Sequence, residues 1–227
     1  MNKKRFVATA ILLVGSAFGA APVLAAENPM DQAGIQHNMY LSCLMETNAS
    51  PDEALAVLVE KCGYNPGMPL ERFIATHKPM VDAIDPTRPM TENLAGLRQQ
   101  LSAYEFSFIV RMDQIAQNAQ DLDAAAMQLE ELEREGIAWL DPKSKNGALV
   151  LGGLSVVRHS ARYWSKFVAG TTSKYAASPD PKKGWSIVTL SDTAGYFAIG
   201  NSVSASAVSY LTFNILVSEG YFPLYAN

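Results

Sequence analysis

An uncharged run of 26 residues, from Thr193 to Ser218, constrains the fold of this 227-residue chain more than any other feature. A helix of that length can cross a bilayer, and a helix that is apolar around most of its girth lies either in a membrane or at the centre of a globule. The segment 191–218 contains six Ser, two Asn and two Thr, which weaken membrane insertion. We therefore expect a buried helix over 191–218, and a constitutive membrane span is disfavoured.

Four small residues recur at steps of four inside this segment. They are Ala194, Ala198, Ser202 and Ser206. Small residues along one face allow helix backbones to approach closely, both in membranes and in water-soluble cores. We expect this set to form a helix-packing ridge.

The first 26 residues have the pattern of a cleaved signal peptide. Lys3, Lys4 and Arg5 precede an apolar run, and small residues then offer a cleavage site after Ala25 or Ala26. The mature protein is thus expected to be exported, in the periplasm of a bacterium or outside the cell. The lysines at 174, 182 and 183 would then flank the uncharged run on its external side, which opposes the positive-inside tendency of membrane spans.

Charge is distributed unevenly along the mature chain. Residues 27–142 carry a net charge of −12, whereas residues 143–227 carry +5. The interpretation that we favour is that the two halves dock on each other; the alternative is that the basic part faces an anionic membrane or partner. The acidic total argues against nucleic-acid binding.

Cys43 and Cys62 are the two cysteines of the chain. Export implies an oxidising compartment, so we expect them to form a disulfide. Closing the loop between these two cysteines would contribute roughly 3 kcal/mol to the stability of the fold in the chain-entropy model. The bond would join a helix over 35–46 to one over 50–62, which Ser50, Pro51 and Glu53 are expected to cap at its start.

A long helical pattern extends over 91–136. Leucine, phenylalanine and isoleucine recur in it at seven-residue spacing, at Leu94, Leu101, Phe108, Ile115, Leu122 and Leu129. This heptad pattern predicts one long helix with a coiled-coil-like seam, or two helices broken near Asn118–Asp121.

A second helix is expected over 148–169, and one of its faces carries Arg158, Arg162 and Lys166. Because this helix also carries apolar residues that need to be buried, we expect it to pack beside the 191–218 helix. The basic stripe is a candidate interaction surface for an anionic group or lipid, and its favoured role is pairing with acidic helix surface such as Glu130–Glu135.

No catalytic or cofactor motif is present. The sequence GNSVS at 200–204 lacks the second glycine of a nucleophile elbow. Zinc-protease, P-loop, Rossmann and C-x-x-C patterns are missing. His37, His77 and His159 are each in a different predicted element, so we expect no metal site and no cofactor.

These observations predict an all-α protein, a compact helical bundle with one long heptad-patterned helix or helix pair and an apolar small-residue C-terminal helix. After the signal peptide (1–26), we expect a single domain (27–227). It would comprise a disulfide-linked hairpin (27–66), a long helical segment (67–141) and an apolar helical pair (147–222).

The expected function is non-enzymatic binding of a protein or ligand in the cell envelope or outside the cell, with a protein partner and an oligomeric state that the sequence does not identify. The alternative is a membrane-active protein whose helices 148–169 and 191–218 insert on a trigger. A hydrolase assembled from scattered residues is a weaker third hypothesis.

Overall fold

The computed structural model describes residues 27–175 and 181–222, so the expected signal peptide lies outside the described residues. Within these ranges the chain forms α-helices and short 3-10 helices, with no strand. The elements are α1 (Gln32–Thr47), η1 (Pro51–Glu53), α2 (Ala54–Glu60), α3 (Leu70–Asp82), α4 (Met90–Asn93), η2 (Ala95–Gln99), α5 (Ala103–Asn118), α6 (Leu122–Trp139), α7 (Lys145–Tyr175), α8 (Pro181–Ile199) and α9 (Ser202–Ser218). The all-α bundle predicted from the sequence is confirmed.

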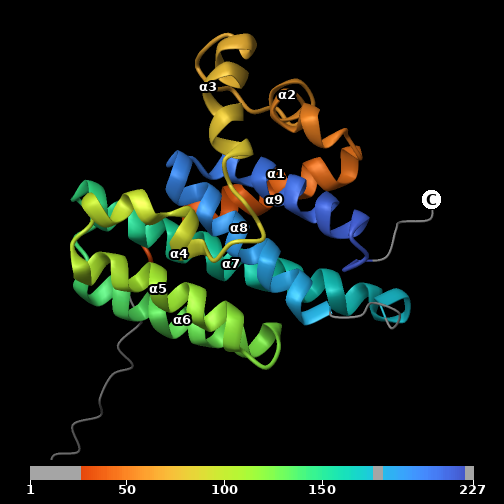
Figure 1. Cartoon of the computed structure of the whole chain (residues 1–227). Coiled ribbons are helices and arrows are strands. Elements are labelled where there is room, and N and C mark those ends of the chain that lie inside the picture. Colours follow the sequence, from red (N-terminus) through yellow and green to blue (C-terminus); the bar gives the residue numbers. More distant parts are fainter. Residues whose placement is uncertain (1–26, 176–180, 223–227) are drawn as a thin grey trace, which may run out of the picture.

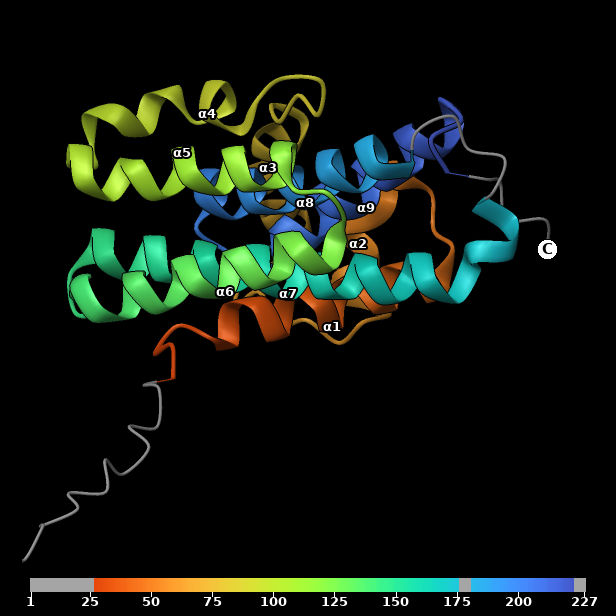
Figure 2. The same cartoon turned by 90° about the horizontal axis from the view of Figure 1, so that it is seen from below.

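The helices pack around α8 and α9, which form an antiparallel pair near the centre. Figure 1 shows α2 and α3 on one side of this pair, with α5 and α6 on the other. Seen from below, α1 lies along α7 (Figure 2). One hydrophobic core connects these elements and contains Leu41 of α1, Phe108 of α5, Trp164 of α7 and Phe213 of α9.

The prediction of one helix over 191–218 is wrong. The chain turns at Gly200, whose φ of 69° lies in the left-handed region that favours glycine. Asn201 then starts α9, because its side-chain oxygen accepts hydrogen bonds from the backbone N–H of Val203 and Ser204. The uncharged run is thus divided between two helices that pack on each other.

The prediction of a single helix over 91–136 is also wrong, and the alternative break near Asn118–Asp121 is present. Helix α5 ends at Asn118, and the Asp121 carboxylate caps α6 by accepting from the N–H of Ala124 at 2.7 Å. A further interruption precedes α5, where Ser102 and Glu105 form a capping box. Residues 90–101 therefore form only the short helices α4 and η2.

The disulfide between Cys43 and Cys62 is present, with a Cα–Cα distance of 5.9 Å. Cys62 lies just after α2, so the bond joins α1 to the end of the second helix. The capping box expected at Ser50 is wrong, because the Ser50 side chain makes no capping hydrogen bond and Pro51–Glu53 forms a 3-10 turn.

Glycines on α1 and α7 allow three helices to approach closely. A Cβ added at Gly34 of α1 would overlap Ser155 and His159 of α7. On another part of α7, a Cβ at Gly152 or Gly153 would overlap the rings of Tyr196 and Phe197 of α8. The close packing of α7 against α1 and α8 therefore depends on glycines of α1 and α7.

Among the helices that the structure describes, none combines the length and the apolarity needed to cross a bilayer.

Candidate functional site

A pocket of about 470 Å³ lies between the 85–89 loop, the C-terminal end of α5 and the first half of α8. This volume lies within the range of small-molecule sites, which are usually concave and contain a few polar groups on an apolar wall. We call it the α5–α8 pocket. It is lined by Pro86, Thr87, Arg88, Pro89, Met90, Asn93, Ala116, Gln117, Lys183, Ser186, Ile187, Leu190 and Ser191.

The rim of the pocket is held by the side chain of Asn93. Its Oδ1 accepts from the backbone N–H of Asp85 at 3.0 Å, while its Nδ2 donates to the backbone carbonyl of Asp85 at 2.9 Å. Pro86 and Pro89 restrict the backbone on the same loop. The loop is thus fixed by the side-chain amide of Asn93 and the rings of Pro86 and Pro89.

A buried carboxylate, Asp113 of α5, supports the wall beneath this rim. Its Oδ2 accepts from the hydroxyl of Thr91 at 2.9 Å, which attaches α4 to α5. Its Oδ1 accepts from Nε2 of Gln117 at 2.7 Å and so fixes one polar side chain of the pocket. Asp113 is only 4% exposed, and these bonds offset the cost of burying it.

Helix α8 supplies the opposite wall. The hydroxyl of Ser186 donates to the backbone carbonyl of Ala116 at 2.8 Å and ties α8 to the end of α5. Ile187 and Leu190 present apolar surface on the same wall, and Met90 of α4 adds to it. The interior of the pocket is therefore suited to an apolar molecular body.

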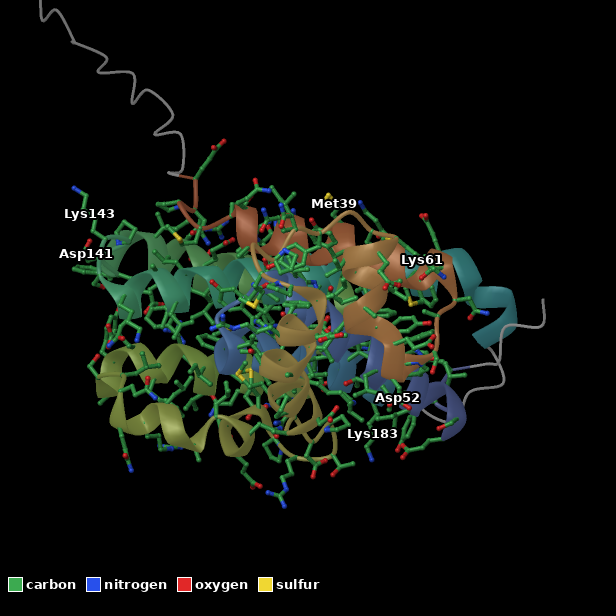
Figure 3. The ribbon with its side chains drawn as sticks, turned by 90° about the horizontal axis from the view of Figure 1, so that it is seen from above. Met39, Asp52, Lys61, Asp141, Lys143 and Lys183 are labelled. Carbon is green, nitrogen blue, oxygen red and sulfur yellow. A yellow bond between two sulfur atoms is a disulfide. The ribbon has the colours of Figure 1, made fainter. Side chains whose placement is uncertain are left out.

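The charges of the pocket come from Arg88 and Lys183, and no acidic residue is among the described residues that line it. Arg88 Nε lies 3.2 Å from Oδ2 of Asp85, just outside the lining. Hydrogen bonds from the side chain and backbone of Thr87 lower the pKa of Asp85, and the charge of Arg88 adds to this. Lys183 Nζ lies 5.7 Å from the ring centroid of Tyr221, on the side of the molecule away from Met39 (Figure 3).

A second polar cluster lies at the centre of the bundle. The Asp192 carboxylate of α8 is fully buried, accepts from the hydroxyl of Ser160, and accepts from Trp164 Nε1 at 3.2 Å. His37 Nε2 of α1 lies 3.9 Å from the same carboxylate oxygen. Burial raises the pKa of Asp192, and the charge of His37 and the bond from Ser160 oppose that rise.

This cluster brings a serine, a histidine and an aspartate together, but not in the order that activates a nucleophile. In that order the serine hydroxyl donates to the histidine, which in turn donates to the aspartate. Here Ser160 donates to Asp192 itself. All three side chains are also 0% exposed, so substrate does not reach them in this conformation.

Two of the basic residues singled out on α7 pair with acidic residues of α6 and with Asp31, which precedes α1. Arg158 pairs with Glu133 and Asp31, and Arg162 pairs with Glu130. Two members of the candidate interaction surface, Arg158 and Arg162, thus pair within the chain with the acidic stretch, as the favoured interpretation expects. Lys166 is exposed.

This ionic network holds the beginning of the described chain. Asn28 donates to Glu133 at 2.6 Å and to the backbone carbonyl of Leu151 at 2.9 Å. His159 Nε2 lies 2.9 Å from the Asp31 carboxylate. Burial lowers the pKa of His159, and the charge of Arg158 lowers it further.

The four residues of the expected ridge do not form one face of one helix. Ala194 is buried on α8, whereas Ala198 is exposed near its end. Ser202 and Ser206 belong to α9 and are buried. The turn at Gly200 separates the two pairs, which is why a step of four residues along the sequence does not continue in space.

The three histidines remain apart. His37 lies in the core, His159 beside Asp31, and His77 on α3, where its Nδ1 is 2.9 Å from the Phe73 carbonyl. In the part of the chain that the structure describes, no three His, Cys, Asp or Glu side chains are grouped as metal ligands are.

No protein-family description, curated protein sequence or solved structure matches this chain. The arrangement of its own residues is therefore the basis for the functional argument.

The sequence alone does not predict the α5–α8 pocket. In the sequence, DPTRP at 85–89 indicates only a break between helices. The pocket forms because Asn93 and Asp113 bring this loop onto α5 and α8, and such contacts between separate elements leave no pattern in a single sequence.

Proposed function

We propose that this protein is an exported, non-enzymatic binding protein whose ligand is a small molecule held in the α5–α8 pocket. The observation that carries the proposal is the pocket itself, with a volume of about 470 Å³ and a lining that combines apolar walls with converging amide, hydroxyl and basic groups. The disulfide between Cys43 and Cys62 supports export, because such bonds persist in oxidising compartments.

Binding by a preformed pocket is favoured over triggered membrane insertion. The apolar side chains of α9 already pack against other helices, and Val208, Phe213 and Leu216 are each at most 4% exposed. Inserting α9 into a bilayer would first require these contacts to be broken, at about 25 cal/mol for each Å² of apolar surface. Pocket binding requires no such rearrangement.

The experiment uses N-phenyl-1-naphthylamine, a neutral apolar dye whose fluorescence rises in an apolar site. An Ile187→Trp variant fills the pocket, because Ile187 lines it. The matched control is Ile35→Trp on α1, where the native side chain is 45% exposed and does not line the pocket. We expect the wild type and the control to bind the dye, and Ile187→Trp to bind it at least about tenfold more weakly, or 1.4 kcal/mol.

Equal dye binding by Ile187→Trp and the control, or no binding by the wild type, would contradict the proposal. Circular dichroism and thermal unfolding of both variants show whether each retains the helical fold. Leakage of liposomes caused by the wild-type protein, in the absence of dye binding, would favour the membrane-active alternative instead.

A further inference from the structure

We infer that the ligand of the α5–α8 pocket is an amphipathic anion, a small molecule with an apolar body and a single carboxylate-like group. This inference rests on the proposed function, since it names the chemical class that the same pocket selects.

The rim carries positive charge from two elements that are far apart in the sequence. Arg88 belongs to the 85–89 loop and Lys183 to the first turn of α8. None of the described lining residues is acidic. An anionic group at the rim would therefore meet two cations, and the planar guanidinium of Arg88 suits a carboxylate.

Two described acids near the pocket, Asp85 and Asp113, already have partners, and those of Asp85 include Arg88 of the rim itself. The Oδ1 of Asp85 accepts from the N–H of Thr87 at 2.9 Å and from its hydroxyl at 2.6 Å. The shortest contact between Asp85 and Arg88 is at Nε, the inner nitrogen of the guanidinium, so this ion pair orients the Arg88 side chain. Asp113 is buried and bound by Thr91 and Gln117.

The deeper part of the pocket selects for an apolar body. Met90 is 1% exposed and Leu190 9% exposed, and both line the pocket together with Ala116 and Ile187. A fully hydrated inorganic anion would leave this surface without a partner. A cationic ligand of the same shape would meet Arg88 and Lys183 at the rim and be repelled.

Three probes with the same ten-carbon chain test the inference: decanoate, decanol and decyltrimethylammonium, each below its aggregation concentration. Displacement of N-phenyl-1-naphthylamine, followed by isothermal calorimetry, measures their affinities. We expect decanoate to bind at least about tenfold more tightly than decanol, and the cation to bind most weakly. Raising the salt concentration should weaken decanoate binding and leave decanol binding unchanged.

Two single variants and their controls test the rim. Arg88→Gln and Lys183→Gln should each weaken decanoate binding about threefold, and the double variant about tenfold, without changing decanol binding. Arg134→Gln is the control for Arg88, because Arg134 forms a surface ion pair with Glu131 at the same three-residue spacing as Arg88 with Asp85. Lys143→Gln is the control for Lys183, and neither control should alter any affinity.

Failure of this inference is distinguishable from failure of the proposed function. Equal binding of decanoate, decanol and the cation, all abolished by Ile187→Trp, would leave the pocket as a ligand site and overturn only the anion assignment. Absence of dye and probe binding would overturn both. Weaker decanoate binding in the control variants as well as in the rim variants would show a nonspecific charge effect and overturn the anion assignment.

Discussion

Asp192 Oδ2 lies 3.9 Å from Nε2 of His37, and both side chains are fully buried. The two residues come from α8 and α1, and Ser160 and Trp164 of α7 donate hydrogen bonds to the same carboxylate oxygen. Burying an ionisable side chain costs free energy unless it is paired and hydrogen-bonded. This contact therefore makes the stability of the central helices depend on protonation.

Replacing Asp192 with asparagine is expected to stabilise the protein increasingly as the pH rises. Burial raises the pKa of Asp192 above its ordinary value of 3.8, so the folded state favours the protonated form. The stabilisation that this raised pKa gives to the folded wild type is complete below pH 3.8. It is lost as the pH rises through the raised pKa. Because asparagine stays uncharged, the gain of Asp192→Asn over the wild type should grow between pH 4 and pH 8.

Urea unfolding at pH 4, 6 and 8 measures the difference. Asp52→Asn is the control, since the Asp52 side chain is 89% exposed. A stability difference for Asp192→Asn that is constant over this range, or no larger than that of the control, would refute the prediction.

Replacing Arg158 with methionine is expected to destabilise the fold by about 3 kcal/mol, because the Glu133 carboxylate would be left buried without its cationic partner. Only 11% of the Arg158 side chain and 7% of that of Glu133 are exposed. The double variant Arg158→Met with Glu133→Gln should be more stable than the sum of the single effects predicts. Chemical unfolding of the four proteins tests this, and strict additivity would argue against the pairing.

Adding a methyl group at Gly152 is expected to cost about 2 kcal/mol, since overpacking a close helix contact forces neighbouring groups apart. A Cβ there would overlap the hydroxyl and ring of Tyr196. Gly96 is the matched control, as a Cβ at that position meets no atom within 4 Å. Thermal unfolding should place Gly152→Ala well below the wild type and Gly96→Ala close to it; similar melting temperatures for both variants would contradict the close packing of α7 and α8.

Removing the disulfide with Cys43→Ser and Cys62→Ser together is expected to lower the free energy of unfolding by roughly 3 kcal/mol, because the unfolded chain gains the freedom of an opened loop. The two residues are 19 positions apart. Adding a reductant should destabilise the wild type by a similar amount and leave the double variant unchanged. A wild type whose urea midpoint is insensitive to reductant would show that the bond contributes little.

The fold class could be predicted from the sequence because helical periodicity is a local signal. The turn at Gly200 was not predicted, because the uncharged residues on either side suggested a continuous helix. The interruption before α5 depends on Ser102 and Glu105, whose capping bonds outweigh the apolar repeat. The start of α5 is therefore set by local capping hydrogen bonds, which the apolar periodicity does not reveal.

The site was harder to predict than the fold. The rim of the α5–α8 pocket needs Asn93 to close the 85–89 loop and Asp113 to hold Thr91, 22 residues earlier. Arg88 and Lys183 then meet at a rim although 95 positions separate them in the sequence. Neither residue carries a local signature of binding, because their role depends on tertiary contacts.

The position of α1 among helices from the other end of the chain has a consequence for how the protein acquires its structure. Gln36 of α1 meets Ser202 of α9, 166 residues later, and the carbonyl of Ala49 accepts a bond from Tyr210 across 161 residues. Such long-range contacts are slow to form, because the entropy of closing a large loop is lost first. Helix α1 therefore completes its contacts only after α9 has reached it, while the local bond between Cys43 and Cys62 can restrict the α1 segment earlier.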